Sequence, residues 1–126
     1  MPKEAPQLKS APAPLAPYSV VTEAHGFVFI SGQVAIDPQT GETPESVTAQ
    51  TKLILRNIGN ILSELGLDYS DIVKTTVFLA DIRDYGDVNT VYGSFFDGKP
   101  PARSAVGAGG LPLTGLKVEI EAIAAR

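Results

Sequence analysis

The sequence predicts an α+β domain in which a mixed β-sheet carries two helices on one face, in the element order ββαβαβ. Segments rich in β-branched and aromatic residues are typical of strands. Apolar residues spaced three and four apart mark amphipathic helices. The expected strands cover residues 18–23, 27–33, 72–80, 102–108 and 117–125, and the expected helices cover residues 43–65 and 85–96.

The N-terminal segment is rich in proline, with five of the ten prolines of the chain in residues 1–17. Because proline fixes φ and lacks an amide donor, we expect this segment to be extended and largely outside the sheet. Residues 1–12 are expected to form a tail that is mobile over about its first ten residues. A chain of 126 residues is expected to form a single domain, spanning 1–126.

A short connection that holds His25 joins the first two strands. A histidine in a turn most often has no chemical role. The second strand ends in Ser31-Gly32-Gln33, where glycine permits either a β-bulge or a close approach of another group to the backbone.

The first helix is expected to begin at Thr43-Pro44-Glu45, because a hydroxyl cap followed by proline is a start signal. Gly66 and Leu67 are expected to end it. The second helix carries a stripe of aromatic residues, which we interpret as part of the core rather than as a ligand site.

One arginine and two glutamates stand out near the C-terminus. Arg103 lies among small and apolar residues, and a buried guanidinium needs partners for its donors. Glu119 and Glu121 are two residues apart, so a strand points both to one face. Two interpretations follow: an internal ion pair between Arg103 and one glutamate, or Arg103 on the carboxylate of a small ligand while a glutamate handles water or a proton.

Composition excludes several kinds of site. A net charge of −4 argues against a nucleic-acid partner. Without cysteine there is no disulfide framework and no thiolate nucleophile, and a single histidine excludes a multi-histidine metal site. No apolar run reaches the roughly 20 residues that span a bilayer, and the N-terminus lacks an apolar secretory core. We therefore expect a soluble, cytoplasmic protein with no membrane partner.

The segment PPARSAV at 100–106, then Leu-Pro at 111–112 and KVEIEAIA at 117–124, resembles the C-terminal signature of the RidA/YjgF family of reactive-intermediate (enamine/imine) deaminases. The resemblance continues upstream through four more segments in the family's order. These are APLAPYS at 13–19, FVFISGQVAIDPQTGE at 27–42, DIVKTTVFLAD at 71–81 and VNTVYGSFF at 88–96. Together they cover nearly the whole chain, which is identified as a member of that family.

The resemblance implies a chorismate-mutase-like domain and a homotrimer around a central barrel, with clefts between subunits. It also implies hydrolysis of imines derived from 2-aminoacrylate to 2-oxo acids and ammonia, with neither metal nor cofactor. Strand pattern alone supports only association of some kind, because several strands are apolar on both faces.

The resemblance also assigns roles to residues. Arg103 would bind the substrate carboxylate as a bidentate fork. Glu119 would position water or relay its proton, and Tyr18 would donate a hydrogen bond to the imine or to that water. Glu121 competes with Glu119, although a structural ion pair is the role we favour for it. The expected pocket wall is completed by Ser31, Asn89 and the backbone of Ala105, where many relatives have cysteine.

Other functions remain open at this point. The same fold could act on another amino-carbonyl intermediate, which the width of the pocket would decide. It could instead serve as a non-catalytic regulator that binds a small acid or RNA. The acidic charge, the lone turn histidine and the absence of a Lys/Arg stripe argue against an RNA enzyme, and the joint presence of Arg103, Tyr18 and Glu119 favours catalysis.

Overall fold

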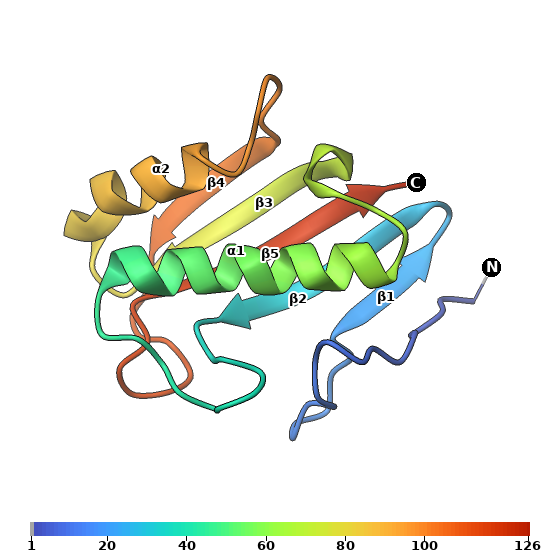
Figure 1. Ribbon diagram of the computed structural model, residues 1–126, viewed down its shortest axis with the longest axis horizontal. Coiled ribbons are helices and arrows are strands. Elements are labelled where there is room, and N and C mark those ends of the chain that lie inside the picture. Colours follow the sequence, from blue (N-terminus) through green and yellow to red (C-terminus); the bar gives the residue numbers. More distant parts are fainter. Residues whose placement is uncertain (1) are drawn as a thin grey trace.

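The computed structural model describes residues 2–126 as one five-stranded sheet with two helices (Figure 1). The elements are β1 (Val21–Ala24), β2 (Phe27–Val34), α1 (Val47–Glu64), β3 (Ile72–Leu79), α2 (Tyr85–Gly93), β4 (Ala102–Gly107) and β5 (Val118–Ala125), with short 3-10 turns at Tyr69–Asp71 and Ile82–Asp84. The α+β class is confirmed. The order is ββαβαββ, which has one strand more than the order ββαβαβ. That shorter order did not count both C-terminal strands, although the segments 102–108 and 117–125 were each expected to be strands and both are.

The sheet is mixed and has the strand order β1-β2-β5-β3-β4. All neighbouring strands are antiparallel except β3 and β4, which are parallel. A parallel pair needs a crossover connection, and α2 provides it. Both helices cover the same face of the sheet, as expected, with α1 over β2 and β5 (Figure 1).

The sheet has a helix-covered face and an open face. In β5, residues Val118, Ile120, Ala122 and Ala124 are buried and face the helices. Because side chains alternate along a strand, Glu119 and Glu121 lie on the open face. Apolar side chains also remain on that face, including Phe27 and Phe29 of β2 and Val106 of β4, which are 42–45% exposed. One apolar layer is therefore covered within the chain and a second is not.

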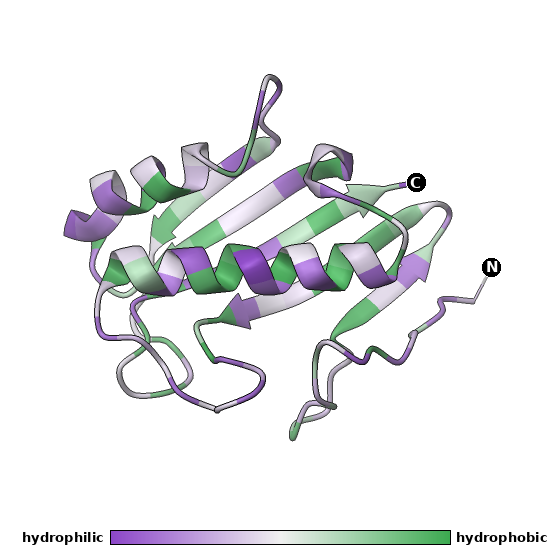
Figure 2. Ribbon diagram, viewed as in Figure 1, coloured by the Kyte–Doolittle hydropathy of each residue, from purple (hydrophilic) through white to green (hydrophobic). Residues whose placement is uncertain are grey.

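Helix α1 begins three residues later than expected from Thr43. Its N-cap is Ser46, whose hydroxyl accepts a hydrogen bond of 3.0 Å from the amide of Ala49. Pro44 lies before the helix, and its carbonyl accepts from the side chain of the buried Gln50 at 2.9 Å. Polar and apolar residues alternate along α1 in Figure 2, as an amphipathic helix requires.

The end of α1 follows the expected glycine signal. Gly66 has a φ of 75°, and the amide of Leu67 donates to the carbonyl of Leu62 at 2.9 Å. This pattern is a Schellman motif, which satisfies the last helical carbonyls.

From Pro2 onward the N-terminal segment is not a free tail, contrary to the expectation for the first ten residues, of which Met1 lies outside the described residues. Glu4 forms a two-hydrogen-bond bridge with Glu23 of β1, and the segment runs beside that strand in Figure 1. Leu8 and Ala11 pack against the core. The amides of Lys9 and Ser10 donate to the carboxylate of Glu64 at the end of α1. Apolar contacts thus hold a segment whose proline content indicated only extension.

Candidate functional site

Arg103 lies on the helix-covered side of the edge strand β4. Its register partner in β3 is Thr75, which is buried beneath α2. One guanidinium nitrogen, Nη2, donates to the hydroxyl of Tyr85 at 3.0 Å. The guanidinium carbon lies 4.8 Å from the ring centre of Tyr92 and 5.5 Å from that of Tyr85. Such distances fit cation–π contacts.

No carboxylate satisfies Arg103 within the described chain. The ion pairs among residues 2–126 join Arg83 to Asp81 and Arg126 to Glu23. Because a guanidinium carries five N–H donors, the single hydrogen bond to Tyr85 leaves most of them for another partner.

Asn89 and Ala105 lie with Arg103. Asn89 follows Tyr85 by four residues and precedes Tyr92 by three, so all three share one face of α2. Ala105 is two residues beyond Arg103 on the same strand face, half-buried and packed against the core. The three expected residues Arg103, Asn89 and Ala105 form one group, which we call the arginine group.

Glu119 and Gly32 adjoin each other on the open face. The β2–β5 register shifts between Ile30 and Gln33, which places Ser31 and Gly32 in a bulge. A Cβ atom on Gly32 would overlap the carboxylate of Glu119. Both properties expected of this glycine, the bulge and the close approach, are therefore present.

The carboxyl group of Glu119 has a pKa above its ordinary value. Burial is the main cause, and repulsion from the nearby carboxylate of Glu121 adds to it. A carboxyl whose pKa is raised in this way is suited to both accepting and donating a proton.

A groove of about 510 Å³ lies on the same side of the sheet as Glu121. Its lining includes Tyr18, Ser31, Glu121 and, from the N-terminal segment, Lys3. Tyr18 is 55% exposed, and the hydroxyl of Ser31 donates to the carbonyl of Ser19 at 2.6 Å. We call Tyr18, Ser31, Glu119 and Glu121 the carboxylate group.

The two groups lie on opposite faces of one sheet. Thr75 and Arg103 face the helices, whereas Thr76 and its register partner Glu121 face away from them. The interpretation of an ion pair between Arg103 and either glutamate is therefore wrong for a single chain. Glu121 likewise forms no ion pair among the described residues of one chain. The alternation of side chains along β5 correctly predicts that Glu119 and Glu121 share one face of the sheet. It does not predict which face of β4 carries Arg103.

Among the described residues, no group of three or more His, Asp and Glu side chains is placed to hold a metal ion. His25 is exposed in the β1–β2 turn with a φ of 53°, followed by Gly26 at 80°. Two successive positive φ values are what a two-residue hairpin turn of type I′ needs. Neither helix of residues 2–126 combines the length and apolar character that crossing a bilayer requires.

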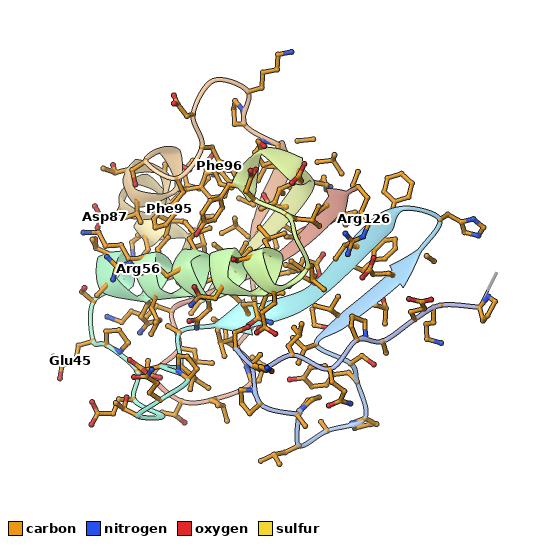
Figure 3. The ribbon with its side chains drawn as sticks, turned by 45° about the vertical axis from the view of Figure 1, so that its right-hand side comes forward. Glu45, Arg56, Asp87, Phe95, Phe96 and Arg126 are labelled. Atoms are coloured by element: carbon orange, nitrogen blue, oxygen red, sulfur yellow. The ribbon has the colours of Figure 1, made fainter. Side chains whose placement is uncertain are left out.

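Sequence reasoning missed three residues that contact or support Arg103, namely Thr75, Tyr85 and Tyr92. The aromatic stripe was expected to belong to the core, which is correct for the buried Tyr92 but not for Tyr85, which is exposed. Figure 3 shows that Phe95 and Phe96, from the same aromatic stripe, do lie on the helix side of the sheet, where they pack against Tyr69. The available signal was the spacing of Tyr85, Asn89 and Tyr92, which places a polar residue between two tyrosines on one helix face.

Comparison with known proteins gives consistent matches. The family model described as Endoribonuclease L-PSP matches residues 8–126. The chain is 46% identical over 115 residues to the 2-iminobutanoate/2-iminopropanoate deaminase of Mus musculus, covering 90% of this chain and 84% of that protein. It is 46% identical over 123 residues to the chloroplastic Reactive Intermediate Deaminase A of Arabidopsis thaliana, covering 97% and 65%.

Solved structures agree with these matches. The crystal structure of E. coli TdcF with bound serine superimposes with a TM-score of 0.88 at 41% identity, covering 95% of this chain and 96% of that one. The structure of the E. coli YjgF gene product gives a TM-score of 0.88 at 42% identity, with coverage of 94% and 95%. With a family model spanning residues 8–126 and relatives at this level of identity, the chain belongs to the RidA/YjgF family.

Proposed function

We propose that this protein is a 2-iminobutanoate/2-iminopropanoate deaminase, which hydrolyses reactive enamine and imine intermediates to 2-oxo acids and ammonia. Relatives that are 44–46% identical carry this name. The observation that carries the proposal is Arg103, a half-buried guanidinium held by two tyrosines and without a carboxylate partner in the described chain. A small substrate with one carboxylate would satisfy its free donors.

Hydrolysis requires that the substrate be oriented, that a water molecule be positioned and that a proton be supplied. The arginine group and the carboxylate group together can meet these requirements. Arg103 binds the substrate carboxylate as a planar fork, which fixes both its position and its plane. Asn89 and the main chain at Ala105 line the same side. An imine carbon is already electrophilic, so a positioned general base and acid suffice.

Glu119 carries the proton transfers in this proposal. Its carboxylate takes a proton from water as the water oxygen bonds to the carbon of the protonated imine, which gives a neutral tetrahedral amino alcohol and a protonated Glu119. The same carboxyl then protonates the nitrogen. The carbon–nitrogen bond breaks, ammonia leaves, and the carboxylate takes the proton of the hydroxyl as the carbonyl of the 2-oxo acid forms. The raised pKa of Glu119 suits a group that accepts and returns one proton. Tyr18 and Ser31 line the site nearby, with Tyr18 as hydrogen-bond donor to the nitrogen or the water.

The site needs two subunits. Since Arg103 and Glu119 face opposite sides of one sheet, one chain cannot direct both at one small molecule. We infer a homotrimer of single-domain subunits in which the arginine group of one subunit meets the carboxylate group of its neighbour. The exposed apolar side chains of the open face, including Phe27, Phe29 and Val106, support burial of that face in an assembly.

Two alternatives and the location of the protein remain predictions. Action on another amino-carbonyl intermediate would keep the same two groups and change only the fit of the groove. Non-catalytic binding of a small acid would keep Arg103 without proton transfer by Glu119. RNA binding is disfavoured by the net charge of −4, although the matching family is described as an endoribonuclease. A cytoplasmic location is proposed on the composition alone.

The direct test is 2-oxo acid release from 2-aminoacrylate, generated in place by a pyridoxal-dependent serine dehydratase. We expect the wild type to exceed spontaneous hydrolysis and Arg103→Ala to lower kcat/KM at least about 100-fold, because the fork is lost. Arg83→Ala is the matched control, since Arg83 is an exposed arginine paired with Asp81. Equal rates with and without the wild-type protein, across several imino acids, would refute the deaminase.

A further inference from the structure

Arg103 is held between two tyrosines that come from one face of α2. The ring of Tyr92 lies 4.8 Å from the guanidinium carbon, and the ring of Tyr85 lies 5.5 Å from it. The hydroxyl of Tyr85 also accepts a hydrogen bond of 3.0 Å from Nη2. A guanidinium is planar, and stacking on aromatic faces is one of the contacts that orient it.

The ring of Tyr92 is held in place by Thr75. Its hydroxyl lies 2.6 Å from the hydroxyl of Thr75, and both residues are buried, with exposures of 6% and 1%. Thr75 is the register partner of Arg103 in the parallel β3–β4 pair. Thr75 and Arg103 are thus paired in the sheet, and both contact Tyr92. These contacts fix the position of the Tyr92 ring relative to β4, the strand that carries Arg103.

The electrostatics agree with this geometry. Burial raises the pKa of Tyr92 above its ordinary value, while its bond to Thr75 and the nearby Arg103 charge act in the opposite direction. Tyr92 is thus a neutral phenol at physiological pH and offers an uncharged ring to the guanidinium. Tyr85 is 42% exposed and lies on the accessible side of Arg103.

We propose that Tyr85 and Tyr92 are positioning residues for Arg103, setting the plane in which its fork meets a carboxylate. Tyr92 supplies a ring anchored to Thr75, and Tyr85 holds Nη2 from the solvent side. This inference rests on the proposed carboxylate-binding role of Arg103. It assigns a function to the aromatic stripe of α2 that core packing alone does not require.

The test compares Tyr85→Phe and Tyr92→Phe with Tyr69→Phe. Tyr69 is the matched control because its hydroxyl also makes a 2.6 Å hydrogen bond, to the carbonyl of Leu55, and its ring joins the Phe95–Phe96 cluster without contacting Arg103. The readouts are KM and kcat for the imine, and the Kd of L-serine by calorimetry. Thr75→Val removes the anchor of Tyr92 from the other side and replaces Tyr92→Phe should that variant fail to fold.

We expect Tyr85→Phe and Tyr92→Phe to raise KM and the Kd of L-serine about tenfold, with kcat within about twofold of wild type, because each weakens a contact that orients a charged donor. Tyr69→Phe should change neither constant. In an Arg103→Ala background the effects of both substitutions should vanish, since they act through that side chain.

Two results would overturn the inference. One is equal KM and Kd values for Tyr85→Phe, Tyr92→Phe and Tyr69→Phe. The other is persistence of the effects after Arg103 is removed. The deaminase can fail separately: a wild type that does not hydrolyse imines but binds L-serine through Arg103 refutes the proposed reaction, and the Kd values then still decide the role of the tyrosines. A wild type that neither hydrolyses imines nor binds L-serine overturns both.

Discussion

Gly32 and Glu119 adjoin so closely that the glycine has no room for a side chain. The bulge in β2 brings the backbone of residue 32 against the carboxylate of Glu119. The bulge therefore shapes the space around the proposed proton carrier, and a β-bulge beside a functional side chain is a recurring arrangement.

Gly32→Ala should displace the carboxylate of Glu119. The φ of Gly32 is not in the left-handed region, so the backbone at this position tolerates alanine and the protein should fold. We expect kcat to fall about tenfold or more with a smaller change in KM, since misplacement by about 1 Å can cost about 100-fold in rate. Gly93→Ala, where a Cβ atom meets open space at the end of α2, should keep wild-type rates. Unchanged kcat in Gly32→Ala would separate Glu119 from catalysis.

Glu121→Gln should shift the acid limb of the pH–rate profile. Repulsion from Glu121 helps to raise the pKa of Glu119 above its ordinary value of 4.5. The ionised form of Glu119 accepts the proton of water, so kcat/KM rises as pH increases through that pKa. Removing the neighbouring charge lowers the pKa, and we expect the limb to move to lower pH. If the acid limb stays in place after spontaneous hydrolysis is subtracted, the limb reports the titration of a group other than Glu119.

Removal of residues 2–11 should destabilise the fold. Leu8 and Ala11 pack on the core, and Glu4 extends β1 by a bridge. Leu8 is partly buried, so loss of its contacts costs about 1 kcal/mol, and we expect Tm to fall by about 3 °C or more. Thermal unfolding followed by circular dichroism measures this shift. An unchanged Tm would restore the interpretation of residues 1–12 as a free tail.

Phe29→Asp should weaken self-association. Phe29 is exposed on the open face of β2, and a desolvated carboxylate without a partner is costly in an interface. Sedimentation should show a smaller species for this variant at micromolar concentration. Lys52→Asp, on the exposed side of α1, places a carboxylate elsewhere on the surface and should leave the assembly intact. If both variants sediment like the wild type, the open face is not the interface.

Local sequence patterns predicted the positions of helices and strands better than the contacts between segments that are distant in the chain. Spacing of apolar residues located both helices, and the Gly66–Leu67 signal located the end of α1 because it depends only on neighbouring residues. The start of α1 was misplaced because Thr43 and Ser46 both carry a hydroxyl that can cap a helix. With the helix starting after Ser46, Gln50 donates hydrogen bonds to the carbonyls of Pro44 and Gly115. Such a contact, 65 residues apart in the chain, has no local signal.

Prediction of the site from the sequence was limited in the same way. Alternation along β5 correctly placed Glu119 and Glu121 on one face. It could not tell that Arg103 faces the other way, because that depends on the register of β3 with both β4 and β5. The expected residues were thus named individually, but their division into two groups required the sheet.

The measurement that decides most directly is a subunit-mixing experiment with Arg103→Ala and Glu119→Gln. Each variant alone should be inactive, because every site lacks one of its two groups. Refolded together in equal amounts, they should recover activity in about a quarter of the sites, since each site draws Arg103 from one subunit and Glu119 from its neighbour. Each variant refolded alone is the control. Failure of the mixture to exceed the two controls, with assembly intact, would show that both residues act within one chain and would contradict the two-subunit site.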